Sequence, residues 1–563
     1  MNNFTKRCVA AFASLAMAGT LCAAGAVTVS SVAWGANTGK TPPNQGGNPS
    51  QAAQPGKAPW ELTADEKTST TGSITINKWE DEVEGGKQKK STPVEGAEFT
   101  VKKATNIDLT KYSDWVNIAN KISDFNEGKE NPGGITFESN GTTKNTSGTD
   151  QGTQKGVAKF DKLGIGLYQV QETKVPKGYS ASESKPFYMT IPMIEKGDGG
   201  KVVYNYNPSA DPKNKNLKKC VKKTADTSET IGAGDKIKYT ISAELDKMKE
   251  TGATALTADD FNGYSVVDLA PAKAFTAYTA DVVKKVTLGT GEKPVDTDTK
   301  LETTDYTVTP DTPADGATER KITISFTPTG QGKLAAEANK PANAGKTVKV
   351  FVALEFTLTS KSADLGTSVT NKGGLIPSHG DGDNPDVVTG EDNEKVEFSK
   401  FKITKVSATN TSTKLPNAKF KLFADKTNAE KCSKAIASNS GVENACAAAS
   451  KGFGEQETGT TGETTEYSLV YKQGRKLYLV ETVAPTGYIR NPDAVEFTVS
   501  QTTTNVPFQN LPNKDNGFWF NLPKTGAAGV ILFALAGVCF VGAGFVVYIH
   551  RRKKEEEQAK LRA

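Results

Sequence analysis

Three kinds of polar side chain recur where the strand pattern points into a core. In each case an apolar residue stands two positions earlier, and side chains two apart on a strand share a face. We therefore expect an ammonium, a carboxyl and a carboxamide group to meet inside a unit, which is costly unless they satisfy one another. The inward lysines are Lys78, Lys223 and Lys405; the glutamates are Glu172 and Glu481; the asparagines are Asn205 (or Asn207), Asn371 and Asn510.

Such a set of groups can react with itself. Burial lowers the pKa of a lysine and raises the pKa of a carboxyl group, so both groups tend towards their neutral forms. A neutral lysine amine can attack an asparagine carboxamide and expel ammonia, while the neutral carboxyl group donates a hydrogen bond to the amide oxygen. The product is an isopeptide bond that joins the first and last strands of a unit. Two alternatives stay open, namely a partly buried salt bridge and lysines that reach the rim of the fold.

The elements that position these groups read as strands. From Ser73 onwards, short runs alternate between apolar and polar residues and are separated by Gly, Pro, Asn and Asp, which is typical of half-buried strands. Examples are Ile74–Ile76, Phe99–Val101, Tyr168–Val170 and Phe187–Met189. Only one stretch before the C-terminal apolar run, Asp114 to Asn126, has apolar residues at helical spacing. The predicted fold class is therefore all-β.

Three sequence blocks occur twice in the same order, which predicts two copies of one β-sandwich. Residues 74–78 return at 401–405, residues 94–99 return at 415–420, and residues 168–179 return at 477–488. A third strand-patterned region lies between the copies, so we expect three sandwiches in series. The predicted boundaries are a signal peptide at 1–36, a flexible leader at 37–72, sandwiches at 73–216, 217–395 and 396–512, and a C-terminal segment at 513–563.

Both ends of the chain carry segments that lie outside this fold. A basic start, an apolar run and small residues indicate a secretory signal peptide over residues 1–36. Near the C-terminus, the 23 residues from Ala527 to Ile549 carry no charge, which suffices to span a bilayer. The basic cluster at residues 551–554 places the short tail behind them in the cytoplasm.

Composition argues against several functional classes. The net charge of +5 is small, and no basic stripe points to nucleic-acid binding. The histidines His379 and His550 belong to no Ser/His/Asp set, and the acidic loop after His379 lacks the spacing of a calcium-binding EF-hand. No cofactor or metal is predicted. Cys432 and Cys446 lie in one exported segment and are predicted to form a disulfide, whereas Cys220 is predicted to be unpaired and buried.

Two motifs carry a resemblance to a known family. Leu522-Pro523-Lys524-Thr525-Gly526, directly before the apolar run, matches the Leu-Pro-any-Thr-Gly sorting signal of Gram-positive surface proteins. In those proteins a sortase cysteine attacks the Thr carbonyl, releases the helix and passes the acyl group to an amine. The block at residues 477–488 resembles the E-box of Gram-positive shaft pilins, and the repeated units resemble collagen-adhesin B-type domains. The resemblance implies an elongated rod of three Ig-like, collagen-adhesin-type β-sandwiches.

The resemblance also implies roles for individual residues. The implied bonds are Lys405–Asn510 with catalytic Glu481 and Lys223–Asn371 with Asp268. Family members differ on whether the first domain has a bond, and Lys78, Asn205 and Glu172 match there in residue type. Pilins of this family accept the sorted threonine on a lysine of a Tyr-Pro-Lys-Asn motif. The nearest match here places that lysine at Lys213, in an exposed Pro-bounded turn, with Lys215 as the alternative.

The resemblance therefore implies the major shaft subunit of a sortase-polymerised, cell-wall-anchored pilus that supports adhesion. The implied partners are other copies of the chain through Thr525–Lys213 links, pilus-specific and housekeeping sortases, tip and basal pilins, and peptidoglycan. One alternative is a wall-anchored adhesin with a β-sandwich stalk that never polymerises. A secreted enzyme with sandwich appendages is a weaker alternative, because no stretch looks like a catalytic domain.

Overall fold

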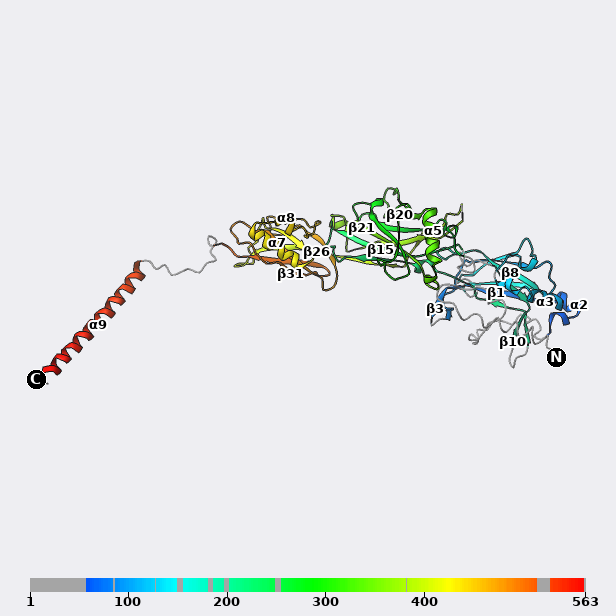
Figure 1. Ribbon diagram of the computed structural model, residues 1–563, viewed down its shortest axis with the longest axis horizontal. Coiled ribbons are helices and arrows are strands. Elements are labelled where there is room, and N and C mark those ends of the chain that lie inside the picture. Colours follow the sequence, from blue (N-terminus) through cyan, green and yellow to red (C-terminus); the bar gives the residue numbers. More distant parts are fainter. Residues whose placement is uncertain are drawn as a thin grey trace.

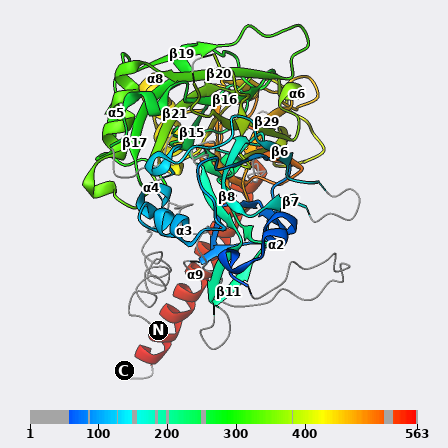
Figure 2. The ribbon, with the colours of Figure 1, turned by 90° about the vertical axis from the view of Figure 1, so that its right-hand side faces the viewer.

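The computed structural model describes residues 57–84, 87–126, 128–148, 155–180, 186–196, 202–248, 255–380, 382–513 and 527–560. The predicted signal peptide, most of the leader and the Leu522–Gly526 motif lie outside these residues. The β-sheets fall into three groups, here called the N-terminal, middle and C-terminal domains, which follow one another along the long axis (Figure 1). Viewed from the end, the domains lie behind one another, as expected for a rod (Figure 2).

The N-terminal domain consists of two main sheets and three short ribbons. The sheets have the strand orders β12-β1-β7 and β6-β5-β8-β9, and the ribbons are β13-β2, β10-β11 and β3-β4. The strands are β1 (Thr71–Asn77), β2 (Trp79–Glu80), β3 (Glu82–Glu84), β4 (Lys87–Lys89), β5 (Glu98–Lys103), β6 (Thr142–Asn145), β7 (Val157–Gly164), β8 (Gly166–Lys174), β9 (Phe187–Ile191), β10 (Met193–Lys196), β11 (Val202–Asn205), β12 (Ser209–Ala210) and β13 (Lys213–Asn214). The predicted helix appears as two pieces, α3 (Tyr112–Ala119) and α4 (Ile122–Asn126), after the short α2 (Ala64–Ser69).

The middle domain is a sandwich of two larger sheets, with strand orders β18-β17-β21-β15-β14-β25 and β19-β20-β16-β23-β24. Its strands are β14 (Val221–Asp226), β15 (Lys236–Glu244), β16 (Ser265–Pro271), β17 (Val283–Gly289), β18 (Thr299–Leu301), β19 (Tyr306–Pro310), β20 (Glu319–Phe326), β21 (Lys349–Thr357), β22 (Ser368–Thr370), β23 (Lys372–Ile376), β24 (Val388–Thr389) and β25 (Asp392–Asn393). Its helices are α5 (Pro328–Ala338) and α6 (Ser362–Leu365).

The C-terminal domain repeats the N-terminal plan. Strand β26 (Lys395–Ser407) pairs with β29 (Tyr467–Tyr471) and, in parallel, with the last strand β32 (Thr503–Asn510). The facing sheet has the order β28-β27-β30-β31. Its strands are β27 (Lys419–Phe423), β28 (Gln456–Glu457), β30 (Lys476–Val483) and β31 (Val495–Thr498), and two helices, α7 (Lys426–Ser438) and α8 (Val442–Ala445), follow β27 in the chain.

The middle and C-terminal domains share one continuous apolar core, whereas the N-terminal domain has a core of its own. Strand β26 begins beside β22 of the middle domain and runs on into the C-terminal domain. At the same joint, the Asp235 carboxylate accepts hydrogen bonds from the Ser450 hydroxyl and the Gly452 backbone N–H. The N-terminal joint is made of polar contacts, such as the Ser180 hydroxyl donating to Asp246 and the Lys177–Asp386 ion pair.

The prediction of a single helix before the C-terminal apolar run was wrong, because α5 and α7 are helices of 11 and 13 residues. Their amphipathic pattern is weak, since α7 buries the small residues Ala429, Cys432 and Ser433. Start signals were nevertheless present in the sequence. Thr327 caps α5 ahead of Pro328, and the Asp425 side chain caps α7.

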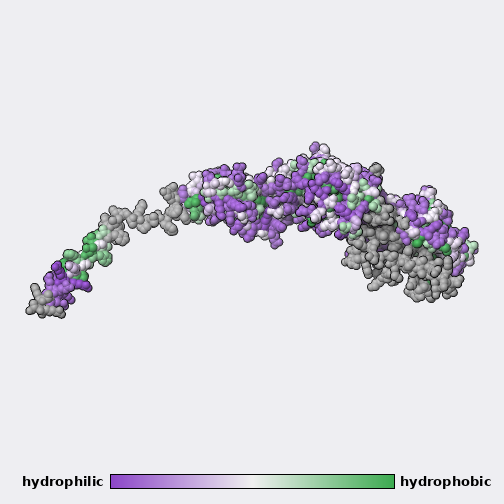
Figure 3. Space-filling model, in the orientation of Figure 1, coloured by the Kyte–Doolittle hydropathy of each residue, from purple (hydrophilic) through white to green (hydrophobic). Residues whose placement is uncertain are grey.

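Helix α9 (Ala527–Lys560) lies apart from the β domains (Figure 1). Its stretch Ala534–Gln558 is the one helix among the described residues that is long and apolar enough to cross a membrane. The hydrophobic colour is most continuous on this helix, whereas the visible face of the three domains is mostly hydrophilic (Figure 3). Among the described residues, the β domains thus form a mostly hydrophilic rod, and the helix suited to a membrane lies beyond its C-terminal end.

The predicted disulfide is present, because Cys432 on α7 is bonded to Cys446, which directly follows α8. Cys220 is free and buried, as predicted.

We expect the double change Cys432→Ser, Cys446→Ser to lower the free energy of unfolding of the C-terminal domain. A closed loop of about 15 residues is worth about 3 kcal/mol. Chemical denaturation of the exported region measures this loss. An unchanged midpoint would contradict the structural role of the bond, and the N-terminal domain, which has a separate core, is the internal control.

Candidate functional site

The C-terminal domain brings Lys405, Glu481 and Asn510 together in its core. Lys405 lies on β26 and Asn510 on the parallel neighbour β32, and their inward faces are opposed by Glu481 on β30 of the other sheet. The Lys405 Nζ lies 3.7 Å from Glu481 Oε1, and the Asn510 Nδ2 lies 2.8 Å from each oxygen of that carboxyl group. The lysine and the glutamate are 0% exposed and the asparagine 2%. An amine, an acid and a carboxamide thus share one dry site.

The surroundings of this set favour neutral groups. The Lys405 Nζ lies over the ring of Phe508, 5.0 Å from its centroid, and donates to the Phe508 carbonyl. Burial lowers the pKa of Lys405 to about 8, against the opposing charge of Glu481. Burial likewise raises the pKa of Glu481, against the opposing charge of Lys405. The Asn510 Nδ2 faces the Glu481 carboxyl group, whereas the Asn510 Oδ1 has no hydrogen-bond partner within the described residues.

The middle domain holds the corresponding set Lys223, Asp268 and Asn371. Lys223 on β14 contacts the Asp268 carboxylate on β16 of the facing sheet, and all three side chains are at most 1% exposed. Burial lowers the pKa of Lys223 to about 8 and raises the pKa of Asp268. Neither polar atom of the Asn371 side chain hydrogen-bonds to another described residue. The Lys223 Nζ lies 3.4 Å from the carbonyl oxygen of Lys372, which directly follows Asn371, so the three groups gather in one part of the core.

In the N-terminal domain the asparagine differs from the predicted one. The Lys78 Nζ lies 2.9 Å from Glu172 Oε2 and 2.7 Å from Asn214 Oδ1, and the Asn214 Nδ2 lies 2.9 Å from Glu172 Oε1. Asn214 is 0% exposed. The predicted Asn205 lies on β11 and donates instead to Glu195, so its assignment to this set was wrong. Asn207, the predicted alternative, is exposed and accepts a hydrogen bond from Ser73.

The position of Asn214 follows from the strand pairing. Strand β1 pairs in parallel with β12, and the following strand β2 pairs in parallel with β13, whereas β11 pairs with β10 in a separate ribbon. An apolar residue two positions before the asparagine was the sequence signal used, and Pro212 stands at that position. Because of this proline, Asn214 does not show the alternation of apolar and polar residues. Its position directly after Lys213 is the sequence feature that could have identified it.

Lys213 and Lys215 are less accessible than predicted. Lys213 lies on β13, where its side chain is 10% exposed and its Nζ is 2.7 Å from Asp81 Oδ1. The expectation of an exposed turn was wrong because this segment pairs in parallel with β2. Lys215 lies at the N-terminal joint, 36% exposed, and forms an ion pair with Glu244.

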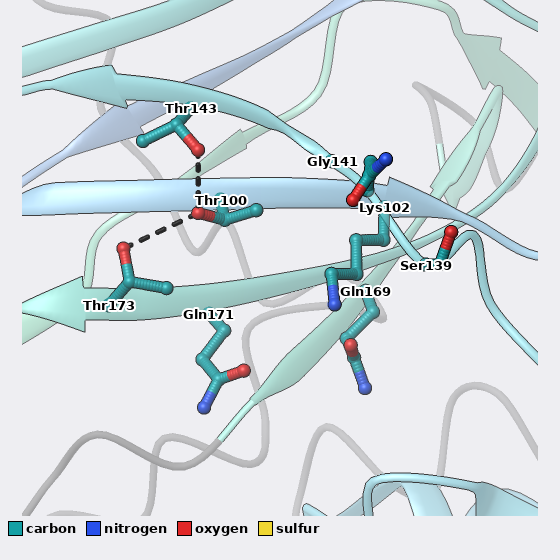
Figure 4. A pocket seen from close by; sticks show the side chains of 9 residues that line it. Thr100, Lys102, Ser139, Gly141, Thr143, Gln169, Gln171 and Thr173 are labelled. Carbon is teal, nitrogen blue, oxygen red and sulfur yellow. Dashed lines mark hydrogen bonds between the residues drawn. The ribbon is translucent and has the colours of Figure 1, made fainter.

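An open polar groove of about 500 Å³ crosses the outer face of the N-terminal domain (Figure 4). It is lined by side chains of β5 and β8, including Lys102, Gln169 and Gln171, and by hydrogen-bonded Thr100, Thr143 and Thr173. Side chains of this face alternate with the inward Phe99 and Val170 (and, beyond them, Glu172), so the groove lies on the side of the sheet away from the lysine set.

The chain matches two protein families. The SpaA family, described as a prealbumin-like fold domain, matches residues 72–205 and 399–512. The LPXTG cell wall anchor motif matches residues 520–556. The two SpaA matches fall on the N-terminal and C-terminal domains, which carry the repeated sequence blocks.

Similar proteins match over most of their length. The chain is 29% identical to the fimbrial subunit type 1 of Actinomyces viscosus, covering 90% of this chain and 94% of that protein. It is 25% identical to the fimbrial subunit type 2 of Actinomyces naeslundii, covering 88% and 93%. The fimbrial protein FimP from Actinomyces oris has a similar fold, with a TM-score of 0.52 and 22% identity over 79% of this chain and 98% of that one.

The buried pair predicts an unusual pH dependence in the variant Asn510→Ala, which keeps Lys405 and Glu481 unlinked. The folded state binds fewer protons than the unfolded state between the lowered Lys405 pKa of about 8 and its ordinary 10.5, so the free energy of unfolding rises with pH there. It binds more protons just above 4.5, where unfolded glutamate ionises, so the free energy of unfolding falls as pH rises from 4.5.

We therefore expect a stability minimum near neutral pH in urea titrations of this variant, with a depth of the order of 1–3 kcal/mol. The matched control adds Lys405→Met and Glu481→Leu, which removes both titrating groups and with them the minimum. Identical profiles for the two variants, or a maximum near neutral pH, would contradict the burial of an unfavourable charge pair.

Fold, motif and relatives agree with the predicted family. The mostly β rod, its two prealbumin-like domains, the anchor signal and two fimbrial relatives over nearly the full length all point the same way. They identify the chain as a structural protein of the sortase-assembled Gram-positive pilin type, anchored to the cell wall at the bacterial surface.

Proposed function

We propose that this chain is the major shaft subunit of a covalent pilus, in which each domain is locked by an internal Lys–Asn isopeptide bond. The observation that carries the proposal is the recurrence of one buried chemical set in three consecutive domains. A single buried lysine–acid pair has many explanations. Three such pairs, each with a buried asparagine beside the acid, are best explained by a common reaction.

The reaction is a single turnover of the protein on itself. In the C-terminal domain, a proton passes between Lys405 and Glu481, which leaves a neutral amine and a neutral acid. The carboxamide turns so that Oδ1 instead of Nδ2 faces the acid, the acid donates a hydrogen bond to Oδ1, and the amine attacks the Asn510 carboxamide carbon. The tetrahedral intermediate then expels ammonia, so one C–N bond forms and one breaks. Asp268 serves Lys223 and Asn371 in the same way, and Glu172 serves Lys78 and Asn214.

The position of the bonds suits a fibre under tension. Lys405 and Asn510 lie on neighbouring parallel strands, so a bond between them carries load directly from the last strand to the first. The residues between them then stay folded. By analogy with a disulfide, closing a loop of about 100 residues also adds about 4.7 kcal/mol through the entropy of the unfolded chain.

Copies join through the sorting signal. A pilus-specific sortase cleaves after Thr525 and transfers its acyl group to Lys213 of another copy, with Lys215 as the alternative acceptor. A housekeeping sortase attaches the finished fibre to peptidoglycan, and tip and basal pilins complete it. In this account α9 holds the subunit at the membrane until the sortase replaces it.

Intact-mass spectrometry of the purified exported region tests the internal bonds. We expect a mass lower than the sequence mass by three ammonia molecules, after allowance for the disulfide. The changes Lys405→Ala, Lys223→Ala and Lys78→Ala should each restore one ammonia. Asn214→Ala should do the same, whereas Asn205→Ala is the matched control and should leave the mass deficit unchanged. A wild-type mass equal to the sum of its residues would refute the crosslinks.

Polymerisation is tested in cells that carry the matching sortase. Wild-type wall extracts should give a high-molecular-weight ladder that survives boiling in detergent, and Lys213→Ala should give only monomers anchored to the wall. Lys215→Ala should keep the ladder, which separates the two acceptor candidates. Monomers alone in the wild type would instead support a stalk adhesin that does not polymerise.

A further inference from the structure

The N-terminal domain contains a second lysine–carboxylate pair besides Lys78 and Glu172. The Lys213 Nζ lies 2.7 Å from Asp81 Oδ1, and the two side chains are 10% and 16% exposed. Lys213 belongs to β13, and Asp81 directly follows β2, its parallel partner. This pair is therefore held by backbone pairing as well as by charge.

The two pairs occupy opposite faces of the same ribbon. In the β2–β13 register, Lys213 stands opposite Trp79 and Asn214 opposite Glu80. Neighbouring residues on a strand point to opposite faces. Asn214 therefore points inward to Lys78 and Glu172, while Lys213 points outward to Asp81. The inner face has a lysine, an acid and a carboxamide, whereas no asparagine side chain in the described part of the chain hydrogen-bonds to the outer pair.

We infer that Asp81 is the catalytic acid–base partner of Lys213 in polymerisation, as Glu172, Asp268 and Glu481 are for the internal bonds. This inference rests on the proposed function. The carbonyl that is missing beside the outer pair is delivered by another copy, as the thioester between its Thr525 and the sortase cysteine. Intermolecular and intramolecular bonds then use the same lysine–acid chemistry with two sources of carbonyl.

The acyl transfer removes two protons from the Lys213 nitrogen. The Lys213 ammonium gives one proton to the Asp81 carboxylate and becomes a neutral amine. The amine attacks the thioester carbonyl carbon, and the C–S bond breaks as the N–C bond forms. The second proton leaves the nitrogen and is taken up by the departing sortase thiolate. The products are a Thr–Lys amide, a sortase thiol and a protonated Asp81, which returns its proton to water.

Exclusion of water from Lys213 and Asp81 favours this proton transfer. Most of both side chains is already covered, and a docked sortase would cover what remains. Removing water from an ion pair costs free energy, and transfer of the proton converts the pair into two neutral groups and relieves that cost. In the internal lysine–acid pairs, whose side chains are at most 5% exposed, the same two groups are already shielded from water.

Other acidic groups near Lys213 are engaged elsewhere. Glu80 and Glu82 bind Lys219, and Asp211 accepts from Lys90, Asn77 and Trp79. These contacts also tie the segment that carries Asp81 to the segment that carries Lys213. Asp81 is thus the carboxylate placed to take the proton.

A two-component assay isolates the acceptor step. The donor carries Lys213→Ala, so it acylates the sortase but accepts nothing, and the acceptor carries Thr525→Ala, so it only accepts. We expect Asp81→Asn in the acceptor to slow formation of the linked dimer at least about tenfold near neutral pH. The loss should shrink as pH rises, because bulk base then supplies the free amine. Asp81→Glu should restore part of the rate, and Asp161→Asn, which removes an exposed carboxylate on β7, is the control that leaves it unchanged.

Separate readouts distinguish the possible failures. Donor acylation, followed by loss of the C-terminal helix, should not depend on the acceptor variant, and the Lys78–Asn214 mass deficit reports whether the Asp81→Asn domain is folded. Dimer formation by Asp81→Asn within twofold of the parent acceptor would overturn the role of Asp81 alone. An Asp81→Asn rate that is low but has the parent's pH profile and no rescue by glutamate would also overturn it. No dimer with the parent acceptor, or an active Lys213→Ala acceptor, would overturn the polymerisation proposal and this inference together.

Discussion

The structure depends on the cost of burying a charged lysine beside a charged acid. Water is excluded from Lys405 and Glu481, so the ionic form of the pair is expensive and the neutral form becomes accessible. In most proteins such a pair would be a liability for stability. Here an asparagine stands beside it, and in the proposed function the energy of the unfavourable pair drives a covalent reaction. The apolar surroundings, including the ring of Phe508, are therefore part of the chemistry as well as of the core.

Topology decides where that chemistry acts. In both repeated domains the first strand has a parallel neighbour near the end of the domain, and the facing sheet supplies the acid. The two strands of such a parallel pair lie side by side although their residues are 136 positions apart at Lys78 and Asn214 and 103 apart at Lys405 and Phe508. A bond between the strands therefore encloses nearly the whole domain. In the middle domain Lys223 lies on β14 and Asn371 directly precedes β23 of the facing sheet, so the same reaction there would join the two layers. The shared core of the middle and C-terminal domains makes them one stiff unit.

Period-two reasoning from the sequence located the lysines and the glutamates because their strands alternate regularly. It did not identify Asn214, because Pro212 interrupts the alternation of apolar and polar residues. The strand that carries Asn214 also comes later in the chain than the one predicted to be last. It also missed the burial of Lys213, because a two-residue strand leaves no periodic signal and its pairing partner lies far away in the sequence. Helices α5 and α7 were not predicted for another reason. The buried face of α7 consists of small residues, and that of α5 combines Gly330 and Ala335 with the charged Glu337, so neither shows a strong helical pattern. Sequence patterns report local propensity, but they do not show which distant strands pair.

The central claim is that neighbouring lysine and asparagine side chains become one covalent unit inside each domain. The most direct measurement is a high-resolution crystal structure of the exported region. We predict continuous electron density between the lysine Nζ and the asparagine Cγ at Lys78–Asn214, Lys223–Asn371 and Lys405–Asn510, with a planar amide and no separate carboxamide nitrogen. Complete, separate asparagine carboxamides at van der Waals distance from the lysines would contradict the account.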